Sequence, residues 1–290
     1  MGRAAERAVA VRSRRPPAAG GGAAPVAYKA PALEKGLDIL ELLAEQSNGL
    51  ILSQIAHHLG RSVQEVYRVV LSLERRGYVT RRPPDDAFQI SLKLFDLASK
   101  HPPLRRLLDA AQPIIQTTAA EVEEALMLSV VDGTRVRVVA VAENPAPIGF
   151  RVRIGTQNRL LSKASGRVLL AFQPPPSGGR LRTMAAEELQ AEGVETARLL
   201  RRVDLIATRG YEMVSDETLR GITDVSFPIL DADGTAQAAL TMPFLSWMAG
   251  EVHLPAAAAK LHRAAAELSR QIGGALPQPD LPMHEIELPG

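Results

Sequence analysis

The chain contains no cysteine among its 290 residues, and this absence removes several kinds of chemistry at once. Disulfide bonds, thiolate nucleophiles and thiolate metal ligands are excluded, which fits a cytoplasmic protein. No apolar run approaches the roughly 18 residues that a membrane-spanning helix needs, so we expect no membrane span. The N-terminus carries arginines but no apolar segment, and we therefore expect no secretory signal there.

Motifs of the common enzyme classes are absent as well. The sequence has no G-x-S-x-G, P-loop, G-x-G-x-x-G or H-E-x-x-H segment. Its six histidines show no metal-ligand spacing with acidic residues. The one candidate for a catalytic group is Ser162 or Ser165 together with Lys163 and Asp224. We expect neither an enzyme activity nor a cofactor.

The charge of the whole chain gives no sign of its partners, because the net charge is only +2. The arginines, however, are unevenly placed. Between His57 and Arg82 there are six arginines (61, 68, 75, 76, 81 and 82) and two acidic residues, Glu65 and Glu74. This local excess of positive charge suits contact with phosphates.

Residues 49–82 have the pattern of two short helices joined by a tight turn. Ser53 is placed to cap the first helix, and Gly60 is placed to end it in a left-handed conformation. Ser62 and Glu65 form an S-x-x-E capping box, which predicts a second helix from Val63. Val66, Val69, Val70 and Leu73 follow the spacing of one buried helix face. A polar face opposite them is typical of a helix-turn-helix that reads DNA.

The segment after this hairpin predicts a β-ribbon, or wing. Two short β-like runs, 78–82 and 87–91, flank the turn-forming residues 83–86. A wing and the local arginines favour DNA binding. Any helical hairpin packed on a core shows a similar pattern, however, so the alternative of a purely structural hairpin stays open on pattern alone.

We expect base contacts from Gln64, Tyr67 and Arg68, because glutamine pairs with adenine and arginine with guanine in the major groove. Arg61, Ser62, Arg81 and Arg82 are expected to contact phosphates and to position the helix. Glu65 either completes the helix cap or accepts from a cytosine amino group, and we favour the cap.

The segments around this motif are less informative. Residues 1–30 are rich in Ala, Arg, Gly and Pro and are predicted to be disordered, either as an inert tail or as a basic arm on DNA. A helix is expected from Pro31, with Leu33, Leu37, Leu40 and Leu43 as its buried stripe. Residues 92–124 read as connecting helices, with a break at 101–103 and an interruption or kink at Pro113, and as a plausible dimerisation surface.

The remainder of the chain predicts an α+β domain with a largely antiparallel sheet. Strands are expected at 126–131, 135–142, 148–154, 211–215, 223–230 and 236–243, and helices at 162–172, 185–191, 195–209 and 254–273. Asp132-Gly133 and Asp231–Gly234 have the composition of tight turns between strands. Residues 277–290 are proline-rich and are expected to be a tail.

Over residues 31–273 the chain resembles the IclR family of transcriptional regulators. The resemblance rests on four blocks: Leu52–Tyr78, Ile154–Ala171, Gly210–Ile229 and Gly234–Met242. It implies a winged helix-turn-helix, a linker helix and a GAF/profilin-like effector-binding domain. It also implies a homodimer or a dimer of dimers that binds operator DNA and responds to a small metabolite, such as an organic acid or an aromatic or sugar catabolite.

Matching these motifs implies a set of effector-contacting residues: Phe150, Ala164, Ser165, Ile222, Asp224 and Thr241. The backbone N–H groups of Ala164 and Ser165 open a helix and offer a seat for a carboxylate or phosphate. Asp224 departs from the cysteine or serine of many relatives. A carboxylate there disfavours a bare anionic effector unless a cation or a proton compensates it, so the identity of the effector is not carried over.

The sequence therefore predicts a two-domain α+β protein that regulates transcription of a catabolic or metabolic operon in response to a ligand. The competing hypothesis is a small-molecule-binding or enzymatic α+β domain whose N-terminal helices serve only for oligomerisation. The predicted boundaries are 1–30 (tail), 31–91 (DNA-binding domain), 92–124 (connector), 125–274 (effector domain) and 275–290 (flexible tail).

Overall fold

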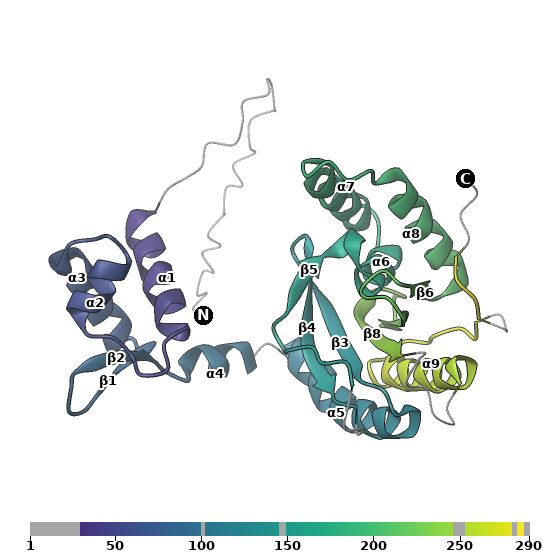
Figure 1. Cartoon of the computed structure of the whole chain (residues 1–290), viewed down its shortest axis with the longest axis horizontal. Helices are drawn as coiled ribbons and strands as arrows, with labels where there is room; N and C mark the ends of the chain where they lie inside the picture. The colour runs from purple at the N-terminus through teal and green to yellow at the C-terminus, as the bar shows by residue number, and fades with distance from the viewer. Residues whose placement is uncertain (1–29, 100–101, 145–148, 246–252, 280–282, 287–290) are drawn as a thin grey trace, which may run out of the picture. The chain divides into compact units, whose positions relative to one another are not determined.

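The computed structural model describes residues 30–99, 102–144, 149–245, 253–279 and 283–286 (Figure 1). The chain divides into two compact units, with the boundary between Ala98 and Ser99. The predicted basic tail, apart from Ala30, lies outside the described residues. None of the helices in the described ranges is long and apolar enough to cross a membrane.

The first unit is the predicted winged helix-turn-helix. Its elements are α1 (Pro31–Ala44), α2 (Leu52–His58), α3 (Val63–Arg75), β1 (Val79–Arg82), β2 (Ala87–Ile90) and α4 (Lys93–Ser99). The two strands pair antiparallel, from Val79 opposite Ile90 to Arg82 opposite Ala87, and form the wing. Gly77 adopts a φ of 77° between α3 and β1, a left-handed conformation that favours glycine.

The core of this unit corrects the prediction for α1. Leu33 and Leu37 are exposed, whereas Gly36, Ile39 and Leu43 are buried. Gly36 lies against Val69 of α3. Leu43 is buried as predicted and Leu40 packs against the same core, so the prediction is wrong for Leu33 and Leu37, in the first half of the helix.

The predicted N-cap of α2 is wrong, and the predicted N-cap of α3 is confirmed. Ser53 does not cap α2: the helix begins at Leu52, two residues earlier than predicted, and Gln54 Oε1 accepts from the N–H of Ile51 (3.0 Å). In α3 the prediction is confirmed, because Ser62 Oγ accepts from the N–H of Glu65 (3.3 Å) and Glu65 Oε2 accepts from the N–H of Ser62 (3.3 Å). Gly60 has the expected left-handed φ, 60°.

The second unit is built on a six-stranded antiparallel sheet in the order β5-β4-β3-β8-β7-β6. The strands are β3 (Leu126–Asp132), β4 (Arg135–Ala142), β5 (Gln157–Arg159), β6 (Glu212–Ser215), β7 (Ile222–Leu230) and β8 (Ala236–Leu245). The helices are α5 (Pro102–Val122), α6 (Ala164–Ala171), α7 (Ser177–Gln190), α8 (Ala197–Arg209) and α9 (Leu254–Gln271), with a short 3₁₀ turn at Leu160–Ser162. Figure 1 shows α5 and α9 side by side on one face of the sheet, and α6 against the other.

One expected strand and one expected helix start in this unit are wrong. The described part of the expected strand 148–154 is not a strand, and the sheet is extended instead by β5, beyond Gly155 with its φ of 91°. Pro113 lies within α5, which continues as one helix across it, so the expected interruption is absent and the alternative of a kink stays a prediction. In addition, α7 begins at Ser177, eight residues before the predicted 185. The helical periodicity of apolar residues does not predict this extension, because Gly178, Gly179 and two arginines interrupt the apolar pattern.

The described part of the C-terminal segment packs against the domain, contrary to the expectation of a flexible tail. The side chain of Ile286 is 6% exposed. Arg202 donates to the Ile286 carbonyl oxygen (3.2 Å), and His262 Nε2 donates to that of Pro277 (2.9 Å). Leu276 and Met283 also pack against the core, and the backbone of His284 contacts Arg209 and Tyr211, so the described part of this proline-rich stretch is held at several points.

Candidate DNA-reading helix and effector cavity

Helix α3 presents a polar, exposed face. Val66 and Val70 point into the core, while Gln64, Tyr67 and Arg68 are exposed. Tyr67 is 45% exposed, so it is available at the surface and is not a core residue. The side chains of Gln64 and Arg68 make no hydrogen bond or ion pair within the part of the chain that the structure describes, which leaves their donors available to base edges.

The arginines predicted to contact phosphates are instead held in ion pairs. Arg61 pairs with Asp38 (2.9 Å) and Arg82 with Asp85 (2.8 Å). Arg81 pairs with Glu74 (2.8 Å) and lies over the ring of Phe88 at 4.9 Å. The pairs of Arg81 and Arg82 are exposed and so are weak and exchangeable, whereas that of Arg61 is partly buried. All three pairs reduce the positive charge that each arginine offers to DNA.

Glu65 belongs to the cap rather than to the reading surface. Its carboxylate accepts from Lys35 Nζ of α1 (2.6 Å) and from Ser62 Oγ (3.0 Å). These bonds, with that from Lys35 the largest cause, lower the pKa of Glu65 to about 2. A carboxylate so occupied is a poor acceptor for a cytosine amino group, which favours the cap interpretation.

Replacing Ser62 with alanine is expected to destabilise the DNA-binding unit by about 0.5–2 kcal/mol, because an N–H of the first turn of α3 loses its acceptor. Denaturant unfolding of the full chain, followed by helical circular dichroism, measures this loss. Ser53→Ala is the matched control, because Ser53 is exposed and caps no helix. Equal losses for the two serines would contradict the role of Ser62.

The second candidate site is a cavity of about 210 Å³ in the second unit, between the sheet and the start of α6. Five of the six predicted effector residues line it: Phe150, Ala164, Ser165, Asp224 and Thr241. Ile222 does not line it, although it is buried at the start of β7. The other lining residues are Met127, Ser129, Val136, Val138, Val152, Thr156, Asn158, Lys163 and Thr218.

Several of these residues were not among the predicted set. Met127 and Ser129 in β3, and Val136 and Val138 in β4, alternate along their strands, and this alternation was a usable signal. Thr218 gave no such signal, because it lies in the loop between β6 and β7.

A short chain of polar contacts crosses the cavity wall. Lys163 Nζ donates to Thr218 Oγ1 (3.3 Å), and Thr218 Oγ1 donates to Asp224 Oδ2 (2.7 Å). Ser226 and Thr241 hydroxyls, on neighbouring strands, lie 2.8 Å apart. Asp224 is only 6% exposed. Burial raises the pKa of the Asp224 carboxyl, and the hydrogen bond from Thr218 opposes this rise.

Asp224→Asn is expected to stabilise the ligand-free protein at neutral pH by a few degrees in melting temperature. A carboxyl whose pKa rises on folding destabilises the fold where it is ionised, at pH above its folded pKa. The cost disappears as the pH falls below the ordinary value. The melting difference between wild type and variant should therefore be largest near pH 8 and should shrink towards pH 4. A difference that does not change with pH would contradict this assignment.

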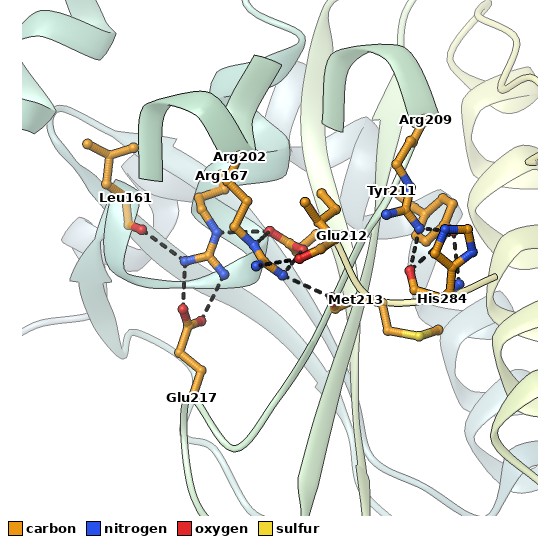
Figure 2. A network of polar contacts seen from close by, with 10 residues as sticks. Leu161, Arg167, Arg202, Arg209, Tyr211, Glu212, Met213, Glu217 and His284 are labelled. Atoms are coloured by element: carbon orange, nitrogen blue, oxygen red, sulfur yellow. Dashed lines mark hydrogen bonds and ion pairs between the residues drawn. The ribbon is translucent and has the colours of Figure 1, made fainter. Parts of the chain in front are cut away.

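A buried ion-pair network adjoins the cavity through the loop that carries Thr218 (Figure 2). The Arg167 guanidinium, fully buried in α6, donates to Glu212 (2.9 Å), to both Glu217 oxygens (2.9 Å each) and to the Leu161 carbonyl (3.0 Å). Arg202 of α8 binds Glu212 from the other side. Glu217 precedes Thr218, so this network fixes the backbone from which Thr218 reaches Asp224.

Comparison with known families identifies both units. Residues 32–83 match the IclR helix-turn-helix domain. Residues 104–270 match the family described as bacterial transcriptional regulator IclR C-terminal. The chain belongs to the IclR family.

Individual relatives of this IclR-family protein agree with the assignment. The HTH-type transcriptional regulator BhcR of Paracoccus denitrificans is 29% identical, over 82% of this chain and 86% of that protein. The crystal structure of the Thermotoga maritima IclR is 26% identical, covers 83% of this chain and 98% of its own, and has a TM-score of 0.64. An IclR homologue from Microbacterium hydrocarbonoxydans, complexed with 4-hydroxybenzoate, shares the fold at a TM-score of 0.66, 83% and 98% coverage and 19% identity.

The family confirms the predicted α+β fold with its N-terminal helix-turn-helix. This IclR-family protein is a ligand-responsive, DNA-binding transcriptional regulator and not an enzyme. The competing hypothesis, in which the N-terminal helices serve only for oligomerisation, is wrong, because those helices match a DNA-binding family. The contacts of individual residues with DNA or effector stay predictions.

Proposed function

We propose that this regulator binds its operator as a homodimer or a dimer of dimers, and that a small metabolite in the 210 Å³ cavity alters that binding. The observation that carries the proposal is the pairing of an exposed, unpaired reading face on α3 with a partly polar cavity in the other unit. A ligand that binds one arrangement of the protein better than another shifts the population between them. This shift changes the distance between the α3 helices of two copies, and with it their fit to the two half-sites of the operator.

Self-association is supported by apolar side chains that a monomer leaves in solvent. Leu33 and Leu37 of α1 are 63% and 48% exposed. Leu92 is 77% exposed, and Phe95 of α4 is 68% exposed. Exposed apolar surface of this kind marks interaction sites. We assign this apolar surface to contact with a second copy of the chain. A dimer has two α3 helices, one for each half-site of an operator.

The genes under control are those of a catabolic or metabolic operon, and the site of action is the cytoplasm, where that DNA lies. The effector is a small organic acid or an aromatic or sugar catabolite. The ligand of the Microbacterium homologue, 4-hydroxybenzoate, is of this kind.

The test is operator binding by the purified full-length protein. Its affinity for its own promoter region should exceed that for random DNA of equal length, and both affinities should fall as salt rises, because binding releases counterions. A metabolite that raises the melting temperature should change the operator affinity. Equal affinity for promoter and random DNA would overturn the proposal, and so would ligand binding that leaves operator affinity unchanged.

A further inference from the structure

We propose that Val63, the first residue of α3, recognises the C5 methyl group of a thymine in each operator half-site. The inference rests on the proposed function, because it assumes that α3 enters the major groove of an operator with two half-sites. It adds an apolar contact to the polar base contacts expected from the same helix, and it makes Val63 a residue that determines sequence specificity.

Val63 is an apolar side chain that the folded unit leaves in solvent. Its exposed fraction is 48%, close to the 45% of Tyr67 one turn further along α3. Val66 and Val70 of the same helix are, by contrast, buried in the core. A single exposed valine is ordinary on a protein surface, so its position on the helix decides what it signifies.

That position is the side of α3 that faces the wing. At about 100° per residue, Val63, Tyr67 and Glu74 fall along one line of the helix. The Glu74 carboxylate accepts from Arg81 Nε of the wing at 2.8 Å, which fixes the direction of this line. Val63 and Tyr67 therefore form an exposed apolar line between the helix and the wing.

The neighbouring line of α3 is polar. It holds Gln64 and Arg68, about 100° further round the helix. Beyond it, the carboxylate of Glu65 is bound to Lys35 of α1 (2.6 Å). Val63 thus lies beside Gln64 at the start of α3, and the N-terminal residues of such a helix are the ones that contact base edges.

The chemistry of the major groove selects the base that suits Val63. The C5 methyl group of thymine is the main apolar group there, and the other base edges present mostly hydrogen-bond donors and acceptors. A valine side chain against a donor or acceptor removes its water without replacing the bond, which is unfavourable. Against the thymine methyl group the same side chain buries apolar surface from both partners, which is favourable.

Uracil interference tests the inference on the promoter region of the protein. The DNA carries deoxyuridine at scattered thymine positions, so each substitution removes one methyl group and keeps the hydrogen-bonding groups of the base. DNA bound by the full-length protein is separated from free DNA, and both are cleaved at the uracils. We expect uracil to be depleted from the bound DNA at a thymine in each half-site. At that thymine, the substitution should weaken binding about three- to tenfold, as for the loss of a buried methyl contact.

A matched pair of variants assigns the methyl contact to Val63. Val63→Ser and Val63→Thr both introduce a hydroxyl group, but only threonine keeps a methyl group that can meet thymine. The serine variant should bind the thymine and uracil operators equally, and the threonine variant should keep most of the wild-type difference. Val194→Ser, at a similarly exposed valine between α7 and α8, should behave as wild type.

The outcomes separate this inference from the proposed function. Specific promoter binding with no thymine depleted in wild type overturns the role of Val63 alone, and this comparison needs no variant to fold. Depletion at the same thymine in Val63→Ser also overturns it. Equal affinity for promoter and random DNA overturns the proposed function and this inference with it.

Discussion

Replacing Arg167 with methionine is expected to destabilise the effector domain by about 3–5 kcal/mol, the usual cost of removing one partner from a buried charge cluster. Arg167 and Glu212 are both fully buried, and Arg167 also binds both oxygens of Glu217. Without the guanidinium, the fully buried carboxylate of Glu212 and the partly exposed carboxylate of Glu217 face the single charge of Arg202 (Figure 2). Urea unfolding of the full chain measures the change.

The control is an ion pair of similar geometry at the surface. Arg182 and Asp204 lie 2.6 Å apart but are well exposed. Arg182→Ala should therefore cost about 0–1 kcal/mol. Adding Glu217→Gln to Arg167→Met should recover part of the loss, because it restores the charge balance. Similar losses for Arg167→Met and Arg182→Ala would show that the buried network contributes no more than a surface pair.

Replacing Arg167 with methionine should also change the polar wall of the cavity. Glu217 is adjacent to Thr218, whose hydroxyl is the donor to Asp224 Oδ2. Releasing Glu217 frees that loop, so effector affinity should fall together with stability. The network thus links the packing of α6 and α8 to the polar wall of the cavity.

Sequence alone predicted the features that depend on local chemistry. The turn at Gly60, the Ser62–Glu65 cap and the start of α3 are set by residues a few positions apart, and all were placed correctly. The choice of face for α1 depended on what packs against it. Leu33 and Leu37 have helical spacing, but Val69 of α3 meets the other side, at Gly36.

The site was predictable only in part for the same reason. Five of the six residues that the resemblance predicts to contact the effector line one cavity, and their contact with an effector stays a prediction. The contacts that give the cavity its charge pattern join residues far apart in the chain: Lys163 with Thr218, and Arg167 with Glu212 and Glu217. No spacing rule applies to pairs separated by 45 to 55 residues, so only the folded sheet reveals them.

Arg68→Ala is expected to weaken operator binding by about 1–3 kcal/mol and to relax the preference at one base position. Arg68 is exposed on α3 and makes no ion pair within the described residues, so its guanidinium can meet a guanine edge without first breaking a contact. Fluorescence anisotropy with the operator and with single-base variants of it measures both effects. Arg75→Ala, near the end of the same helix, is the matched control and should leave base preference unchanged.

Arg82→Ala should behave differently, with a smaller loss that is the same for every DNA sequence. Arg82 is paired with Asp85 in the wing, so part of its charge is already neutralised before it meets a phosphate. Arg61 and Arg81 are paired as well, with Asp38 and Glu74. Of the six arginines near α3, only Arg68, Arg75 and Arg76 are without such a pair among the described residues. A single winged helix-turn-helix unit therefore offers few unpaired positive charges to DNA. Its affinity for the operator should for this reason depend on a second copy of the chain. If Arg68→Ala and Arg82→Ala weaken all sequences alike, the division between residues that read bases and residues that position the helix is wrong.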